Sequence, residues 1–465
     1  MKIFAKGVFK IEGANKLQEN KMGIMPVNKL LISMSLPMII SMIVQALYNV
    51  VDSIFVSYIS ENALTAVSLA FPAQNLMIAF ASGTSVGVNA LLSKSLGEKN
   101  FDKANKAAEN GLFLVFIEYL IFLIFGIFGV RFFYNMQTDV AEIIEYGYSY
   151  MTVCSIFSFG VFGQIMTERL MQSTGRTIYT MFTQGAGAII NIILDPVLIF
   201  GLGFFPKMGI AGAAWATVIG QIFAFILALI LNAKYNKDIK LSVKHFRPDK
   251  KIIGRIFSVG IPSTIMMAIG SVMNFMFNKI LISFTETAAA VFGVYFKLQS
   301  FIFMPVFGMN NGIIPIIAYN YGAQKRKRMM KAVKLGIVYA LMFMVAGLII
   351  MQLFPEQLLS IFNATPDMVK IGIPALRTIS ICFVFAGFCI VIGSVFQALG
   401  RGTFSMIVSV ARQLVVLIPA AYLLSLTGEL NNVWWAFPIA EIASVIASAA
   451  CFIYLYKKVI RKIPE

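Results

Sequence analysis

Apolar runs of about 20 residues follow one another along almost the whole chain, and each can cross a hydrocarbon core of about 30 Å as an α-helix. Charged residues make up 13 % of the 465 residues, whereas about a quarter is usual in a soluble domain. We therefore predict an all-α polytopic membrane protein. Its twelve transmembrane helices are expected over residues 30–59, 67–95, 107–130, 146–170, 177–203, 209–232, 253–283, 287–317, 330–353, 371–397, 404–427 and 433–456.

Lysine and arginine are distributed unequally over the two sides that twelve crossings define. With the N-terminus in the cytoplasm, 31 of the 38 lysines and arginines lie in or beside cytoplasmic segments. This is the positive-inside pattern of membrane proteins, and it predicts that both termini are cytoplasmic. Because topology accounts for the net charge of +17, we expect the lipid bilayer and no nucleic acid as a partner.

Residues that would support enzyme or metal chemistry are sparse. The four cysteines lie within apolar runs and form no CxxC pair, and the single histidine lies in a basic loop. This pattern favours neither a disulfide framework nor a metal site. No Walker motif and no secretory signal peptide are evident. We expect no catalytic residue, no cofactor and no bound metal other than a transported Na⁺.

The second half of the chain repeats the first. One ungapped register aligns, among others, Pro37 with Pro262, Asn49 with Asn274, Gly83 with Gly308, and QSTGR (172–176) with QALGR (397–401). Six helices per repeat is an even number, so the two bundles should be related by a pseudo-twofold axis along the membrane normal. The repeat predicts a cytoplasmic N-terminal segment (1–29), an N-lobe (30–232), a basic cytoplasmic linker (233–252), a C-lobe (253–456) and a cytoplasmic tail (457–465).

Several of these segments resemble one known family. SLPMIISMIVQALYNVVDSIFVS (35–57), QSTGRT (172–177), Asn191-xxx-Asp195-Pro196 and GIAGAAWAT (209–217) are similar to motifs of the multidrug and toxic compound extrusion (MATE) transporters. In the second half, ARQLVVLIPAAYLL (411–424) and WWAFPIAE (434–441) resemble the MepA-type bacterial branch. The resemblance extends over nearly the whole chain, from about residue 26 to 456.

The resemblance implies a secondary active transporter of a bacterial cell (inner) membrane. Such a protein would export cationic or amphiphilic drugs, dyes and antimicrobials by antiport with H⁺ or Na⁺, with a cavity between the lobes that opens alternately to each side. We expect a monomer. A lipid-linked sugar flippase of the same superfamily is the nearest alternative, and a membrane-embedded enzyme is a weaker one.

One pair of intramembrane acids in the N-lobe calls for a functional explanation, because charge inside a membrane is costly. The stretch of chain from Lys29 to Asp52 is similar in length to that from Arg176 to Asp195, so both acids reach a similar depth. Buried carboxylates can hold a proton near neutral pH, and oxygen ligands also suit Na⁺. The resemblance assigns a cation-coupling site to Asp52, Asn191, Asp195 and Thr217. Helical spacing adds Gln45 and Asn49 as weaker candidates, which could equally form interhelical hydrogen bonds alone.

The C-lobe departs from this pattern. Position 277, which aligns with Asp52, is Phe, and position 420, which aligns with Asp195, is Ala. We therefore expect no matching cation site there. The C-lobe instead has three charged residues that we expect to lie inside the membrane: Lys297, Arg412 and Glu441. We expect an internal ion pair that involves Glu441. Glu118 of the N-lobe has no partner that the sequence identifies.

A substrate cavity is expected between the lobes, on the helices that line the central cleft in the resembling family. Aromatic rings and flexible methionines suit flat cations of varied shape. Such residues are frequent throughout the chain, with 42 Phe and 26 Met, so lipid contact or packing is an alternative role for each of them. The candidates are Tyr48, Phe71, Gln74, Asn274, Met276, Tyr295, Gln299 and Met304.

Overall fold

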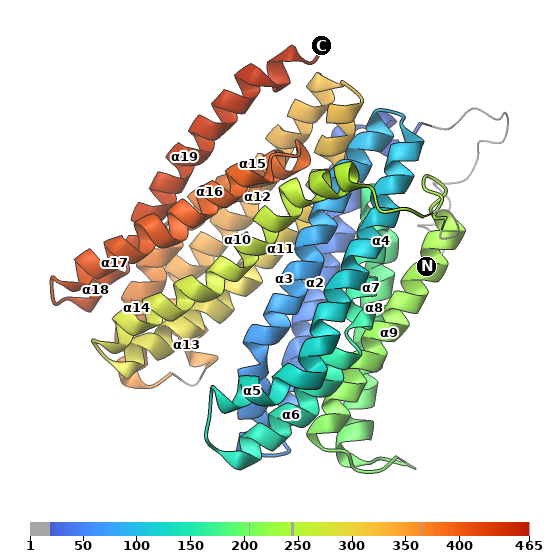
Figure 1. Cartoon of the computed structure of the whole chain (residues 1–465). Helices are drawn as coiled ribbons and strands as arrows, with labels where there is room; N and C mark the ends of the chain where they lie inside the picture. The colour runs from blue at the N-terminus through green and yellow to red at the C-terminus, as the bar shows by residue number, and fades with distance from the viewer. Residues whose placement is uncertain (1–18, 204, 243–245, 363, 465) are drawn as a thin grey trace, which may run out of the picture.

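The computed structural model describes residues 19–203, 205–242, 246–362 and 364–464, and every regular element in these ranges is helical (Figure 1). A short helix α1 (Lys21–Ile24) precedes the N-lobe. The N-lobe contains α2 (Val27–Ser57), α3 (Glu61–Gly97), α4 (Phe101–Ile124), η1 (Phe125–Gly129), α5 (Val130–Asn135), α6 (Ala141–Ile156), α7 (Phe159–Ser173), α8 (Thr177–Phe200) and α9 (Ile210–Tyr235). The C-lobe and tail contain α10 (Lys250–Ile282), α11 (Glu286–Gly322), α12 (Arg326–Leu353), α13 (Pro355–Ser360), α14 (Pro366–Ser380), α15 (Phe383–Ala398), α16 (Gly402–Val410), η2 (Ala411–Leu417), α17 (Ile418–Ser425), α18 (Leu430–Val433), α19 (Ala436–Lys458) and η3 (Ile460–Lys462).

The number of membrane spans agrees with the prediction, but two of the spans are bent. In the described residues ten helices are long and apolar enough to cross a membrane, and two bent pairs bring the total to twelve if each pair is one span. The pairs are α6 with α7, bent by 44°, and α14 with α15, bent by 47°. The sequence predicts continuous helices over 146–170 and 371–397, and the breaks at 157–158 and 381–382 correct it. Neither break contains Pro or Gly, the residues that usually mark one in a sequence.

The internal sequence repeat is also a repeat of helix ends. Helices α3 and α11, at Glu61–Gly97 and Glu286–Gly322, begin and end at positions that the repeat aligns with each other. Their N-caps match as well, because the side chains of Ser60 and Thr285 both accept a hydrogen bond from a backbone N–H of the first turn. The same local signal therefore starts the same helix in both lobes.

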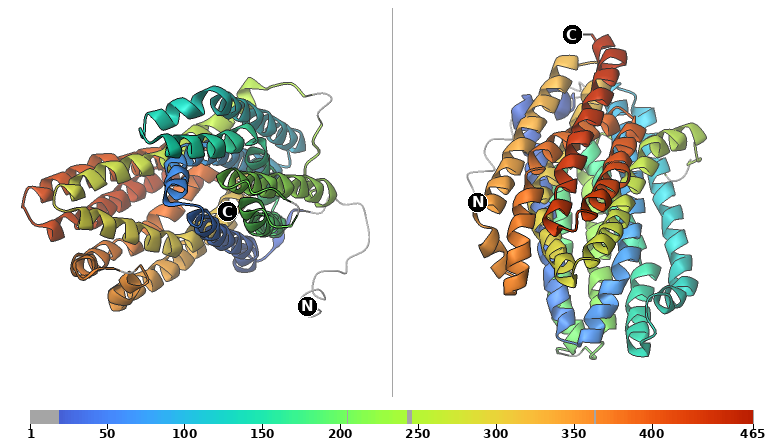
Figure 2. Two further views of the ribbon diagram at one scale, coloured as in Figure 1. Left: turned by 90° about the horizontal axis from the view of Figure 1, so that it is seen from below. Right: turned by 90° about the vertical axis from the view of Figure 1, so that its left-hand side faces the viewer.

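The backbones of the two lobes contact each other where α3 and α11 end. A Cβ atom at Gly97 would lie 2.0 Å from the carbonyl oxygen of Tyr319, and one at Gly322 would lie 2.1 Å from that of Lys94. The missing side chains therefore allow two backbones to touch. In the view of Figure 2 (left), the yellow-to-red helices of the C-lobe gather on one side and the blue-to-green helices of the N-lobe on the other.

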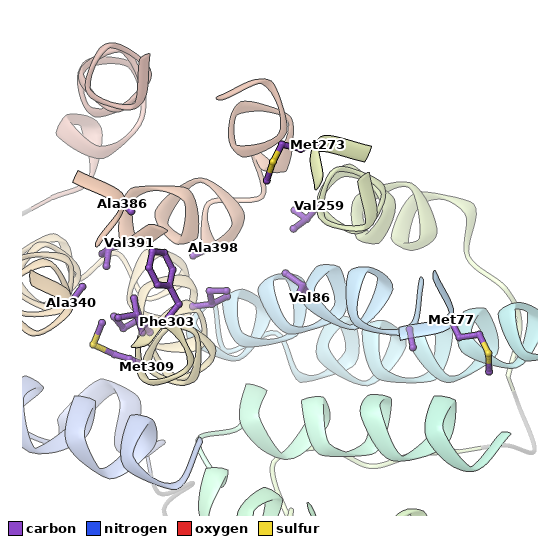
Figure 3. Close-up of a cluster of buried hydrophobic side chains, with 14 of the residues drawn as sticks. Met77, Val86, Val259, Met273, Phe303, Met309, Ala340, Ala386, Val391 and Ala398 are labelled. Carbon is purple, nitrogen blue, oxygen red and sulfur yellow. The ribbon is translucent and has the colours of Figure 1, made fainter. Parts of the chain in front are cut away.

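A single apolar cluster connects the lobes and continues into both. Figure 3 shows part of it, including Val86 on α3 and Val259 on α10, which belong to different lobes. In the C-lobe the cluster contains Phe277, which is fully buried. Its ring lies 4.8 Å from that of Phe292 and 4.9 Å from that of Phe437, measured between centroids. The position that aligns with Asp52 is thus filled by aromatic packing.

Truncation of this packed ring should destabilise the C-lobe. We expect Phe277→Ala to lower the free energy of unfolding by about 3–5 kcal/mol, the usual cost of removing a buried aromatic side chain. Thermal unfolding in detergent measures the effect. Phe301→Ala is the matched control, because Phe301 is half exposed on the neighbouring helix α11. Equal melting temperatures for the two variants would contradict the buried role of Phe277.

Helix α1 lies across the joined ends of both lobes. The side chain of Asn20 donates a hydrogen bond of 2.9 Å to the carbonyl of Thr174 in the N-lobe. On the C-lobe side, Asn320 and Arg328 donate to the carbonyl of Met22, at 3.1 and 3.2 Å. Met22 is fully buried. The segment therefore contacts both lobes at once at the end where they meet.

The docking of α1 should depend on pH through Lys21. Burial, together with the nearby positive charge of Arg176, lowers the pKa of the Lys21 ammonium from 10.5 to about 8. An undocked Lys21 keeps its ordinary pKa and binds more protons, so docking is weakest below about pH 8 and strengthens as pH rises toward 10.5. A spin label at the exposed Ile24 should lose mobility over this interval. In Lys21→Met the mobility of the spin label should no longer depend on pH over this interval. A label whose mobility increases with pH in the wild type would contradict this account.

Candidate functional site

A cavity of about 760 Å³ lies between the lobes. Its wall contains residues of α2, α3, α7, α8 and α9 from the N-lobe and of α10, α11, α15, α16, η2 and α19 from the C-lobe. Volumes of several hundred Å³ are typical of sites for drug-sized molecules. Asn191 and Thr217 of the N-lobe and Arg412 and Glu441 of the C-lobe belong to this wall.

The N-lobe group is organised by Asn191 of α8. Its side-chain amide donates to Asp195 Oδ1 at 3.3 Å and to Thr217 Oγ1 at 3.3 Å. Asn191 and Thr217 line the cavity, whereas Asp195 does not line it and is fully buried. Asp52 of α2 is buried too and lies close enough to Asp195 for their charges to interact. The structure therefore brings together all four residues that the resemblance assigns to cation coupling.

A close approach of α8 and α9 explains this arrangement. A Cβ atom at Gly187 would lie 3.0 Å from the carbonyl oxygen of Gly220, and one at Gly220 would lie 2.8 Å from that of Gly187. Asn191 lies one turn after the first glycine, and Thr217 lies about one turn before the second. Two glycines that face each other thus hold the amide and the hydroxyl within hydrogen-bond distance.

Three oxygen atoms of this group remain without a hydrogen-bond partner among the described residues. They are Asp52 Oδ1, Asn191 Oδ1 and Asp195 Oδ2, and all three are buried. Buried polar atoms normally have a partner, and an exception needs an explanation. Carboxylate oxygens can hold a proton, and carboxylate and amide oxygens together can coordinate a small hard cation such as Na⁺.

The structure gives the two weaker candidates of α2, Gln45 and Asn49, different surroundings. Gln45 lines the cavity, but Asn49 is exposed and is not part of the cavity wall. The expectation that both share the face of Asp52 is therefore wrong for Asn49. Residues at i and i+3 differ by about 60° around a helix, and this rotation directs Asp52 toward the bundle and leaves Asn49 at its edge.

Of the eight residues expected in the substrate cavity, Tyr48, Tyr295 and Gln299 line it. Phe71, with 64 % of its surface exposed, and Met276 are exposed and lie outside the cavity wall. Gln74 instead donates a hydrogen bond of 3.2 Å to the hydroxyl of Tyr150 inside the N-lobe. The other two expected residues outside the cavity wall are Asn274 and Met304.

The C-lobe charges form a pair and one separate cation. Arg412 Nη1 donates to Glu441 Oε2 at 2.9 Å, and both residues line the cavity. Lys297 does not belong to this group. Its side chain is exposed, and its ammonium lies 5.9 Å from the centre of the Phe362 ring. The expectation of an internal Lys297 is thus corrected, because counting residues from a helix end gives depth but not the face on which a side chain lies.

The structure also places a carboxylate that the sequence reasoning missed. Glu168 of α7 is buried and lines the cavity. It accepts hydrogen bonds from Thr183 Oγ1 at 2.7 Å, from Gln184 Nε2 at 2.7 Å and from Gln164 Nε2 at 3.0 Å. The adjacent Arg169 donates to Asn311 of the C-lobe at 2.9 Å and so links the lobes. An acid and a base side by side within a predicted span are the signal that could have identified this group.

Glu118, which the sequence leaves without a partner, has one in the fold. The hydroxyl of Thr84 on α3 donates a hydrogen bond to Glu118 Oε1. Glu118 is buried inside the N-lobe and does not line the cavity. Its position is that of a packed interhelical contact between α3 and α4.

The comparisons with known proteins agree with this architecture. The family model MatE matches residues 37–197 and 262–423. The multidrug export protein MepA of Staphylococcus haemolyticus is 26 % identical over 426 residues, which cover 91 % of this chain and 92 % of that protein. An FAD transporter of Shewanella oneidensis is 24 % identical over 437 residues, which cover 93 % of this chain and 95 % of that protein.

A solved structure shows the same fold. It is described as the outward-facing conformation of a multidrug resistance MATE family transporter of the MOP superfamily, and it superimposes with a TM-score of 0.88. The alignment covers 97 % of this chain and all of the other at 25 % identity. The two matched segments of the family model begin at Pro37 and Pro262, which the internal repeat aligns with each other.

Proposed function

The chain belongs to the MatE family of multidrug efflux transporters, and from this premise we propose that it exports cationic or amphiphilic drugs, dyes and antimicrobials by antiport with H⁺ or Na⁺. One observation carries the proposal. Three buried oxygens of Asp52, Asn191 and Asp195, which have no hydrogen-bond partner among the described residues, lie at or directly behind the wall of a drug-sized cavity. A cation site and a substrate site that share Asn191 provide the contact that coupling requires.

The proposed mechanism starts from the costly negative charge of the N-lobe group. A proton or Na⁺ that enters it cancels one of the two negative charges of Asp52 and Asp195 and changes the hydrogen bonds of Asn191. Pro196 supports movement at this point, because it lacks the N–H that would pair with the carbonyl of Ile192 and so leaves α8 easier to bend. We infer that α2 bends in response, displaces the drug and allows the lobes to alternate.

The setting in the membrane belongs to the same proposal. We place the N-lobe at 30–232 and the C-lobe at 253–456, joined by a cytoplasmic linker at 233–252. The N-terminal segment (1–29) and the tail (457–465) would both lie in the cytoplasm of a bacterial cell whose inner membrane contains the transporter as a monomer. The positive-inside distribution of lysine and arginine supports this orientation.

Proteoliposomes test the proposal directly. Purified protein is reconstituted, a fluorescent organic cation such as ethidium is added, and ΔpH and ΔpNa are imposed separately. We expect one gradient, or both, to drive dye movement, and the responding gradient identifies the coupling ion. Dye movement that follows neither gradient would overturn the antiport mechanism. The flippase alternative predicts instead that a lipid-linked sugar moves from one leaflet to the other and that the dye is not transported.

A further inference from the structure

Arg412 is placed unusually for a guanidinium inside a membrane protein. It lies on the π-helical segment η2, and such segments occur frequently at functional sites. Its side chain is 36 % exposed, whereas that of its partner Glu441 is only 4 % exposed. Because Arg412 lines the cavity, this exposed part is available to a molecule inside the cavity.

Most of the hydrogen-bonding capacity of Arg412 is unused. A guanidinium has five N–H donors, and a single hydrogen bond, to Glu441 Oε2, joins Arg412 to the described residues. Glu441 holds the guanidinium from the buried side and leaves the cavity side open. Next to the pair, the hydroxyl of Tyr295 is buried without a partner in the described part of the chain. The C-lobe wall therefore offers several donors that have no partner among the described residues, beside one unpartnered oxygen, Oε1, of the Glu441 carboxylate.

The opposite wall also has a carboxylate and a guanidinium. Glu168 lines the N-lobe side of the cavity, and the three side chains that donate to it are neutral. Arg169 lines the same side, and its guanidinium donates to Gln172 and Asn311. A molecule in the cavity therefore meets Glu168 on one wall, and on the other Arg412, which has a single hydrogen bond to the described residues.

We propose that Arg412 is a recognition residue for the anionic group of zwitterionic substrates, whose cationic end lies toward Glu168 on the N-lobe wall. A carboxylate is the matching group, because a guanidinium can bind it through two parallel hydrogen bonds. Glu441 acts as a positioning residue that keeps the guanidinium directed into the cavity. This inference rests on the proposed export function and assigns a residue to the anionic group of those substrates that carry both charges.

A matched pair of dyes tests it. Rhodamine 123 is a cationic methyl ester, and rhodamine 110 is the free acid of the same dye and a zwitterion. Both are measured in proteoliposomes under the driving gradient. In the wild type both dyes should be transported. In Arg412→Gln the ratio of rhodamine 110 to rhodamine 123 transport should fall about tenfold or more, the size expected for the loss of a charge-assisted hydrogen bond.

Two further variants keep the test decisive. Arg412→Gln leaves Glu441 buried and unpaired, so Arg412→Gln/Glu441→Gln removes both charges and should show the same fall in the ratio. Arg412→Lys keeps the charge without the planar fork and should give a smaller fall. Lys297→Gln, at an exposed cation away from the cavity, is the control and should keep the wild-type ratio.

The outcomes separate the two proposals. A wild type that moves rhodamine 123 but not rhodamine 110 would overturn the anion-recognition site and leave the export function intact. The anion-recognition site would also be overturned, with the export function intact, if both dyes are moved and the ratio of rhodamine 110 to rhodamine 123 transport in Arg412→Gln/Glu441→Gln equals that of the wild type. A wild type that moves neither these dyes nor ethidium under either gradient would overturn the export function itself.

Discussion

Asp195→Asn should abolish the response of transport to the driving gradient, and Asp52→Asn should do the same. Each change removes a charge that the coupling ion neutralises, while the amide keeps the shape of the side chain. Coupling free energies between two sites typically correspond to a factor of about 5 to 150 in affinity. We therefore expect gradient-driven dye movement to decrease by about that factor.

The measurement is dye transport in proteoliposomes under the gradient that drives the wild type, with the rate compared to that at zero gradient. Asn49→Ala is the matched control, since Asn49 is a polar residue of the same helix α2 that is exposed and outside the cavity wall. It should keep the full response. An Asp195→Asn protein as responsive as this control would remove the N-lobe group from the coupling mechanism.

Gly97→Val should separate the lobes at the end where α3 and α11 meet. The new Cβ would lie 2.0 Å from the carbonyl oxygen of Tyr319, so one backbone must move. Overpacking of this kind costs about 1–3 kcal/mol and occasionally more. Such a cost lowers the ratio of closed to separated protein by a factor of about 5 to 160. Transport should fall with it, because alternating access needs the closed arrangement.

Spin labels at Asp102 and Lys331, exposed residues at the start of α4 and α12, report the separation. The four free cysteines are first replaced so that only these positions are labelled. In Gly97→Val the distance distribution should shift to longer values. Gly254→Val is the control, because a Cβ there meets nothing within 4 Å. A distribution identical to that of the control would show that the glycine contact does not hold the lobes together.

Much of the fold is predictable because its signals are local. A hydrocarbon core selects apolar stretches of a given length, and a helix satisfies its own backbone hydrogen bonds, so spans such as Glu286–Gly322 can be identified from composition alone. The repeat adds a check that needs no structure, since Ser60 and Thr285 start equivalent helices. The bends at 157–158 and 381–382 could not be predicted from the sequence, because neither break contains the Pro or Gly that usually marks one.

Only part of the candidate site could be predicted from the sequence. Asn191 and Asp195 are neighbours at i and i+4 on one helix, so their proximity follows from helical geometry. The addition of Thr217 depended on the resemblance to a family, and the structure explains its contact through the glycines that let α8 approach α9. Asn49 shows the limit of helical spacing, which gives relative rotation along one helix but not the direction of its neighbours.

The amino-acid sequence by itself determined the membrane class, the apolar spans and the duplication, since all of these depend on short-range pattern and length. Only the tertiary structure decided which charges meet. It paired Arg412 with Glu441, placed Lys297 outside, and turned Glu168 into the cavity. The physical reason is that the packing of helices against one another sets the rotation of each about its axis, and a pattern along a single helix contains no record of its neighbours.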